Sequence, residues 1–194
     1  MTEPRWNSNL HALDLLLDEV PDGAHDGLDV GCGEGETARH LRARVPHVVG
    51  IDPDETSIEL ARAAGDDIDY RLAELHTADL GDSGFDVVTC VAMLHHVDQA
   101  TGLTDLARLV RPGGILLVVG LARSRSVADY LRDAVDAVAL RRHTLRTPVW
   151  ETPSPKVWPP PLTYAQTKAV SLDALPTATF RRLSYFRYGL TWRP

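Results

Sequence analysis

The sequence contains only two cysteines among its 194 residues, Cys32 and Cys90, and their placement excludes several kinds of site. The first lies in a glycine-rich segment and the second at the end of an apolar run, so they form no metal-ligand spacing. We therefore expect no metal centre. Disulfides are rare in reducing compartments, and nothing in this pattern predicts one.

Long apolar runs and targeting signals are also missing. No uninterrupted apolar run approaches the ~20 residues that a membrane-spanning helix requires, so we expect no membrane contact. The first residues, Met-Thr-Glu-Pro-Arg-Trp-Asn, lack the basic and then apolar pattern of a secretory signal, which predicts a cytoplasmic protein. Length and composition fit one globular domain over residues 1–194.

Basic residues are scarce in the first half of the chain. Residues 1–97 contain 6 Lys/Arg against 20 Asp/Glu, a net charge of −14, whereas residues 98–194 contain 14 against 7, a net charge of +7. A basic half can face an anionic substrate or a nucleic acid. We favour mutual neutralisation of the two halves, because no dense Lys/Arg run with interleaved aromatics is present. We expect no nucleic-acid partner.

The most informative feature present is a glycine-rich turn. Residues 28–35 read Leu-Asp-Val-Gly-Cys-Gly-Glu-Gly, and residues 50–53 read Gly-Ile-Asp-Pro. An apolar strand, a turn with alternate glycines, a helical pattern and a second strand ending in an acid form the front half of a nucleotide-binding βαβ unit. Glycine lets the backbone turn tightly and approach a ligand closely.

The glycine spacing indicates which nucleotide is bound. The spacing is G-x-G-x-G, and Glu36 occupies the position of the third glycine in a dinucleotide-binding G-x-G-x-x-G motif. An acid at the start of a helix is a poor neighbour for a pyrophosphate. The sequence therefore disfavours NAD and FAD.

Strand and helix patterns alternate through most of the chain, which predicts an α/β fold with a doubly wound, mostly parallel sheet. Helical spacing is found at 8–20, with Ser8 as the expected N-cap, and at 36–45, 53–64, 99–109, 126–142 and 163–172. Apolar or β-branched runs at 28–30, 48–51, 70–72, 85–91 and 115–119 predict strands, and Arg111 to Gly114 predicts a turn.

Three segments are expected outside this regular alternation. Residues 1–25 form a helical lid, and residues 177–193 form a strand pair added to the sheet edge. Residues 147–161 contain six prolines and two tryptophans, which predicts a loop without regular structure. The tryptophans favour docking of this loop onto the protein or a ligand.

Four sequence blocks together carry a family resemblance. They are L-D-V-G-C-G-x-G, G-I-D, F-D-x-V followed by L-H-H, and R-P-G-G, in this order. The chain resembles class I S-adenosylmethionine (SAM)-dependent methyltransferases, in a small bacterial subgroup, over nearly its whole length. The resemblance implies a Rossmann-like, seven-stranded sheet with an antiparallel C-terminal strand, SAM as cofactor and a small-molecule acceptor. The protein is then a monomer or a homodimer.

The resemblance and the residue chemistry together indicate the cofactor site. Asp29 is expected to pair with the cofactor's amino group, Asp52 to accept from both ribose hydroxyls, and Pro53 to pack on the adenine. Glu74 and the Leu75 N–H are expected at the adenine edge. The full expected set is Asp29, Gly31, Cys32, Gly33, Gly35, Asp52, Pro53, Glu74, Leu75, Cys90 and Val91.

Histidines are the candidate catalytic residues. His95 and His96 follow the strand at 85–91, and His11 lies on the N-terminal helix. A general base is needed only where the acceptor must lose a proton, and histidine suits that role near neutral pH. Oxygen is therefore slightly favoured over nitrogen or carbon as the acceptor atom. Trp6 and Trp150 are expected to line the acceptor site, or alternatively to anchor irregular segments.

Two other functions remain open from the sequence. One is methylation of RNA or protein, which the basic second half would suit. The other is a SAM-fold protein that binds without methyl transfer or performs another reaction, such as a cyclisation. The acids Asp29 and Asp52 favour retained cofactor binding but do not bear on transfer.

Overall fold

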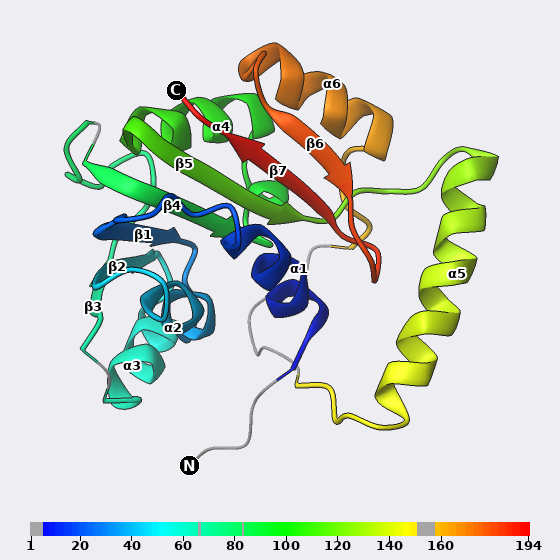
Figure 1. Ribbon diagram of the computed structural model, residues 1–194, viewed down its shortest axis with the longest axis horizontal. Helices are drawn as coiled ribbons and strands as arrows, with labels where there is room; N and C mark the ends of the chain where they lie inside the picture. Colours follow the sequence, from blue (N-terminus) through cyan, green and yellow to red (C-terminus); the bar gives the residue numbers. More distant parts are fainter. Residues whose placement is uncertain (1–5, 66, 83, 151–157) are drawn as a thin grey trace.

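The computed structural model describes residues 6–65, 67–82, 84–150 and 158–194. Within them, one seven-stranded sheet has the order β3-β2-β1-β4-β5-β7-β6 (Figure 1). Its strands are β1 (Asp26–Val30), β2 (His47–Asp52), β3 (Asp69–Leu72), β4 (Phe85–Val91), β5 (Val110–Gly120), β6 (Thr179–Arg182) and β7 (Tyr188–Trp192).

Strand directions confirm the predicted sheet. The pairs joining β3, β2, β1, β4 and β5 are all parallel, whereas β7 pairs antiparallel with both β5 and β6. The short connection between β6 and β7 explains this reversal, because a tight turn can join only antiparallel neighbours. β7 is therefore inserted between β5 and β6, as an antiparallel strand in an otherwise parallel sheet.

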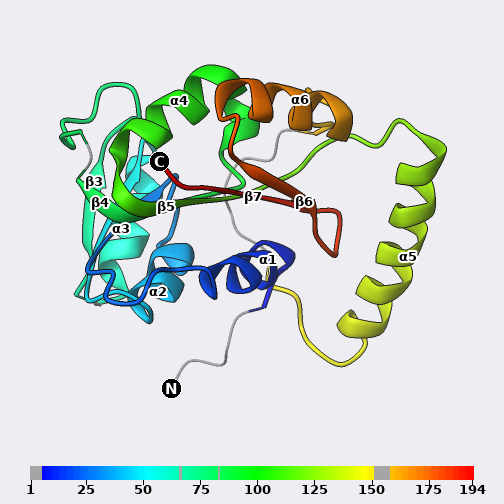
Figure 2. The same ribbon diagram turned by 45° about the horizontal axis from the view of Figure 1, so that its top comes forward.

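Helices cover both faces of the sheet, so the fold is doubly wound as predicted. They are α1 (Ser8–Leu17), α2 (Glu36–Arg42), α3 (Glu55–Ala63), α4 (Gln99–Leu109), α5 (Val127–Thr144) and α6 (Tyr164–Ala174), with a 3-10 turn η1 (Leu94–His96). Figure 2 shows α1, α2 and α3 on one face and α4 and α6 on the other.

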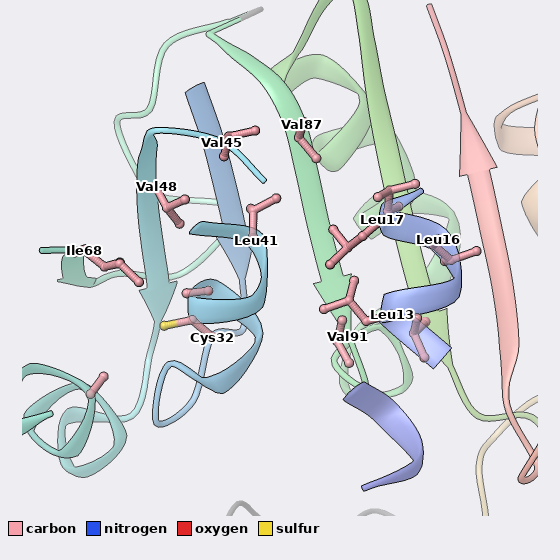
Figure 3. Packing of buried hydrophobic residues seen from close by; sticks show 14 of the residues in the cluster. Leu13, Leu16, Leu17, Cys32, Leu41, Val45, Val48, Ile68, Val87 and Val91 are labelled. Carbon is pink, nitrogen blue, oxygen red and sulfur yellow. The ribbon is translucent and has the colours of Figure 1, made fainter. Parts of the chain in front are cut away.

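Each face has its own apolar core, because successive side chains of a strand point to opposite faces. On β4, Val87 packs with the helices α1 to α3, and Val88 packs with α4. Figure 3 shows the first core, in which Leu13 and Leu16 of α1 point toward the sheet.

The N-terminal helix differs from its prediction at both ends. Asn7 rather than Ser8 is the N-cap, and its Oδ1 accepts from the Asn9 and Leu10 N–H groups at 2.9 Å each. The helix ends at Leu17, three residues before the predicted end. Because α1 contacts β5, β7 and α2, the segment predicted as a lid contributes a core helix.

The predicted turn at Arg111 to Gly114 is wrong as a boundary, because these residues lie inside β5. Pairing shifts there: Phe85 pairs with Val110, and Val87 pairs with Ile115. Pro112 lacks an N–H for the ladder, and Gly113 has a positive φ of 84°. The glycine-proline segment therefore forms a bulge within a strand rather than a turn before one.

Helix α5 presents its apolar side to solvent. Val127, Leu131 and Val135 are 77%, 66% and 65% exposed, whereas Asp136 on the opposite side is 3% exposed. Figure 1 shows α5 standing apart from the sheet, beyond β6. The predicted amphipathic helix is therefore present, but its acidic face is the one turned toward the protein. Among the described residues, no helix is long and apolar enough to cross a bilayer.

Candidate functional site

A cavity of about 730 Å³ opens at the carboxyl edge of the sheet. The parallel strands β1, β2 and β4 all end at this edge, where open α/β sheets bind ligands. β7 begins at the same edge, because Tyr188 pairs with Gly120 at the end of β5. Many predicted site residues line the cavity: Gly31, Cys32, Gly33, Asp52, Pro53, Glu74, Leu75, Val91, His95, His96 and Trp150.

The glycine turn after β1 forms one wall of the cavity. The Gly31 and Cys32 N–H groups both donate to the Ile51 carbonyl, at 2.9 and 3.0 Å, which ties the turn to the end of β2. Gly31 has a φ of +74°, and a Cβ there would lie 2.8 Å from the Met93 side chain. Only glycine fits this position without moving the neighbouring turn.

Asp52 connects the glycine turn to the tip of β2. Its Oδ2 accepts from the Gly33 N–H and its Oδ1 from the Asp54 N–H, both at 2.9 Å. Each carboxylate oxygen can accept more than one hydrogen bond, so acceptor capacity remains on the cavity side. The carboxylate is therefore held in place by the backbone while it borders the cavity.

Asp29 lies beneath the glycine turn rather than on the cavity wall. It is fully buried, and its Oδ1 accepts from the Thr89 hydroxyl at 2.8 Å, whereas its Oδ2 has no hydrogen-bond partner within the described residues. Burial raises the pKa of Asp29 to about 7, against the opposing effect of the Thr89 hydrogen bond. Asp29 is therefore absent from the cavity lining, and its predicted pairing with a ligand amino group stays a prediction.

A second wall follows β3. The Ala73 N–H donates to the Asp52 carbonyl at 3.1 Å, which continues the β2–β3 pairing beyond the strands. Glu74 and Leu75 then border the cavity, and Leu75 is buried. Both predicted residues at the adenine edge are therefore in the same cavity as Asp52.

The two cysteines have different positions. Cys32 lines the cavity, whereas Cys90 is fully buried beneath it in the second core. Burial raises the thiol pKa of both well above its ordinary value, so neither forms a thiolate readily. Val91, which follows Cys90, does line the cavity.

The histidine pair at the end of β4 lies together in η1. The rings of His95 and His96 are 4.2 Å apart between centroids, and both border the cavity. Burial lowers the pKa of His95 to about 4, and the charges of His96 and Arg187 act in the same direction. His95 is therefore neutral at pH 7, and the same lowered pKa makes its ring a weak base.

The predicted aromatic residues separate into two groups. Trp150 lines the cavity, whereas Trp6 and His11 lie outside its lining. The Trp6 ring lies 3.9 Å from that of His143 and 5.4 Å from that of Tyr185, and His11 lies 5.1 Å from Tyr185. Trp6 still contacts a residue of the cavity lining, because its carbonyl accepts a hydrogen bond from the Trp150 N–H at 2.8 Å.

The predicted loop at 147–161 is only partly described, because residues 151–157 lie outside the described ranges. Its first part pairs with the N-terminal segment through a bridge between Trp6 and Val149. Trp158 from its last part lines the cavity while remaining 75% exposed. The ends of the loop thus come to the same edge of the cavity.

Comparison with known proteins identifies the family. Residues 28–118 match the methyltransferase domain family. An uncharacterized methyltransferase of Mycobacterium tuberculosis is 40% identical over 197 aligned residues, which cover all of this chain and 98% of the relative. The chain belongs to the class I SAM-dependent methyltransferases.

Further relatives of this methyltransferase match over part of the chain. A ubiquinone biosynthesis O-methyltransferase of Hahella chejuensis is 39% identical over 103 residues, covering 50% of this chain and 43% of the relative. The solved structure of SAM-bound CalS10, an amino pentose methyltransferase of Micromonospora echinaspora, is 26% identical. It has a TM-score of 0.51 and covers 58% of this chain and 50% of its own.

One residue that supports the glycine turn, Arg39, was not predicted from the sequence. Arg39 donates to the Glu34 carbonyl at 2.8 Å and pairs with Glu36 at 3.1 Å, which secures the glycine turn from the side of α2. The i, i+3 spacing of Glu36 and Arg39 was a visible signal for this contact.

The predicted residue Gly35 does not line the cavity, and a Cβ there would lie 2.2 Å from the Tyr70 hydroxyl.

Proposed function

We propose that this methyltransferase binds SAM in the cavity and transfers its methyl group to a small-molecule acceptor, with oxygen favoured as the acceptor atom. The observation that carries the proposal is the Asp52 carboxylate, fixed by two backbone N–H groups at the end of β2 and facing the cavity. A carboxylate in this position accepts well from paired ribose hydroxyls.

The other walls fit the same nucleoside. Gly31 and Gly33 line the cavity without side chains, so a ligand can approach the backbone closely there. Glu74 and Leu75 border the cavity next to Asp52, at the place proposed for adenine. Pro53 offers an apolar ring to the same region.

Asp29 supports the site from below. Among the described residues its Oδ2 has no hydrogen-bond partner, and an unpaired buried oxygen is unfavourable unless a donor reaches it. We infer that cofactor binding supplies positive charge above this carboxyl and favours its ionised form. Asp29 then contributes to cofactor binding through its charge.

Methyl transfer requires alignment more than acid–base chemistry. When bound, SAM supplies an electrophilic methyl group on a positively charged sulfur. The chain's part is to orient the acceptor and exclude water, which the apolar walls near Met93 and Trp150 favour. His95 borders the cavity and is neutral at pH 7, so its ring can accept a hydrogen bond from a hydroxyl acceptor and orient it, although its lowered pKa makes it a weak base.

A titration with S-adenosylhomocysteine, the demethylated cofactor, tests this site. We expect wild-type protein to bind it with micromolar affinity, about 8 kcal/mol. Removing a charge-assisted acceptor costs about 1.5–3 kcal/mol, so Asp52→Ala is expected to bind about 10- to 100-fold more weakly. Asp69→Ala removes an exposed acid of β3 that pairs with Arg71 and serves as the matched control.

Calorimetry measures all three affinities. Absence of binding by the wild-type protein, or equal affinities of wild type and Asp52→Ala, would contradict the proposed site. The acceptor is then sought with trideuteromethyl-labelled SAM and a metabolite extract. A product gaining one labelled methyl group, absent without the enzyme, identifies the acceptor and its methylated atom.

A further inference from the structure

Arg187 brings a largely buried positive charge to the cavity wall. Its Nε donates to the Asn9 Oδ1 at 2.6 Å and its Nη1 to the Tyr185 carbonyl at 3.2 Å, and Arg187 also lines the cavity. Within the described residues Nη2 makes no hydrogen bond, and no carboxylate pairs with the guanidinium. Both partners are neutral, so the positive charge is solvated but not compensated.

Other arginines of the same region are paired. Arg182, five residues earlier, contacts the Asp129 and Asp133 carboxylates at 2.7 and 3.1 Å. Burial lowers the pKa of Arg187 to about 10, which still leaves the guanidinium charged at pH 7. Burying a charge without a counter-ion is costly, and the cost is offset when an anion binds.

The turn between β6 and β7 fixes the position of Arg187. Tyr185 and Phe186 have φ values of 60° and 65°, which are strained for residues with large side chains. The Phe186 N–H donates to the Asp136 Oδ2 at 3.1 Å, and the Phe186 carbonyl accepts from the Tyr164 hydroxyl at 3.0 Å. Contacts from α5 and α6 therefore hold a strained turn whose last residue is this arginine.

Arg187 lines the cavity from the β7 side, whereas the glycine turn follows β1. Arg187 precedes β7, which is three strand positions from β1 in the sheet. With a strand spacing of about 4.8 Å, this corresponds to about 14 Å. His95 follows β4, which lies between β1 and β7, and the positive charge of Arg187 helps to lower the pKa of His95. Apolar side chains also line this cavity, among them Leu10, Met93, Val97, Leu121 and Trp150.

We propose that Arg187 binds a carboxylate group of the acceptor, so that the methyltransferase acts on carboxylic acids with an otherwise apolar body. The inference rests on the proposed function, since it assigns the acceptor side of the same cavity. A guanidinium suits a carboxylate geometrically, because its planar N–H groups match the two oxygens. The apolar walls then accommodate the remainder of the acceptor.

Matched acids and amides test the charge requirement directly. Benzoate, phenylacetate, 3-phenylpropanoate and octanoate are titrated in the presence of S-adenosylhomocysteine, each beside its neutral primary amide. We expect at least one acid to bind wild-type protein tenfold or more tightly than its amide. The preference should fall below twofold in Arg187→Gln and persist in Arg181→Gln, whose side chain is exposed on β6 and pairs with Glu19.

A second measurement avoids dependence on a variant that fails to fold. In the wild-type protein, the Arg187 Nε–H resonance should shift on addition of the tighter acid and remain in place with its amide. Equal binding of every acid and its amide, or an unmoved resonance under a bound acid, would overturn the proposal. Arg187→Lys keeps the charge without the planar fork and should retain part of the preference.

The same variants distinguish failure of the Arg187 proposal from failure of the proposed cofactor site. Arg187→Gln should bind S-adenosylhomocysteine within twofold of wild type. A loss exceeding tenfold would mean that Arg187 holds the cofactor's own carboxylate, and the acceptor assignment would be wrong. Failure of the wild-type protein to bind S-adenosylhomocysteine would instead contradict the proposed function, and the acid–amide titrations are repeated without it to test Arg187 alone.

Discussion

At the scale of single residues, the acids of the cofactor site have opposite environments. Asp52 borders the cavity and accepts two backbone N–H groups, so its charge is stabilised by the chain. Asp29 lies beneath the turn with one orphaned oxygen, and burial raises its pKa to about 7. The two carboxylates therefore contribute differently to stability and to binding, although both lie at or near the carboxyl end of a strand in the same motif.

The pH dependence of stability reports on Asp29. An Asp in the unfolded chain has a pKa of about 3.9. With a pKa of about 7 in the folded protein, Asp29 keeps its proton in the folded state while the unfolded state loses it. Its contribution therefore falls as pH rises from about 4 to about 7, by an amount on the order of a few kcal/mol, and is constant above that range.

Comparison of wild type with Asp29→Asn isolates this contribution. We expect the free energy of unfolding of the variant, relative to wild type, to rise with pH between about 4.5 and 7 and then to level off. Urea denaturation of both proteins across this range measures the difference. Parallel stability profiles would show that Asp29 titrates in the folded protein as it does in water.

At the scale of elements, α5 is oriented by its polar side chains. Asp129 and Asp133 pair with Arg182, and Asp136 accepts from the Phe186 N–H. These acids recur at intervals of three and four residues, so they share one face of the helix. The helix is thereby fastened to the β6–β7 turn that carries Arg187, while its apolar face remains exposed.

Two substitutions on adjacent residues of α5 test this orientation. Asp136→Ala removes the partner of a backbone N–H in the strained turn, which should lower the free energy of unfolding by about 1–3 kcal/mol. Val135→Ser changes a side chain that is 65% exposed and should alter it by less than about 0.5 kcal/mol. Urea denaturation measures both. A larger loss in Val135→Ser would mean that the apolar face is buried in solution.

At the scale of the whole molecule, the cavity depends on segments from across the chain. The glycine turn follows β1, the histidine pair follows β4, and Arg187 precedes β7. Asn9, near the start of α1, contacts Arg187 from the other end of the chain. A ligand filling this cavity would therefore connect elements on both sides of the sheet and stabilise the fold as a unit.

Thermal unfolding measures that coupling. With S-adenosylhomocysteine at a hundredfold excess over its dissociation constant, the folded state should gain about 2.7 kcal/mol. For a chain of this size, the midpoint should rise by about 5–10 °C. Scanning fluorimetry at matched protein concentration records the shift. Asp52→Ala, which binds about 10- to 100-fold more weakly, should gain only about 0.4–1.4 kcal/mol at the same ligand concentration, a rise of about 1–5 °C. An unchanged wild-type midpoint would contradict cofactor binding.

Local patterns were sufficient for much of this architecture. The β-branched run at Phe85–Val91, the glycine turn and the acid at Asp52 each determine their own structure through nearest neighbours and burial. The alternation of these units is enough to predict a parallel, doubly wound sheet. The same blocks carry the family resemblance, which is why the methyltransferase identity was available before any coordinates.

Tertiary contacts determined which side chains border the cavity. Nothing local distinguishes Trp150, on the cavity wall, from Trp6 behind it, or shows that Asp29 is buried beneath the turn. The orientation of α5 depends on a hydrogen bond between Asp136 and Phe186, which are 50 residues apart. The position of Arg187 depends on a hydrogen bond to Asn9, which is 178 residues away. Such contacts are set by packing between distant segments, so the sequence determined the fold and family, and only the folded chain determined the chemistry offered to the acceptor.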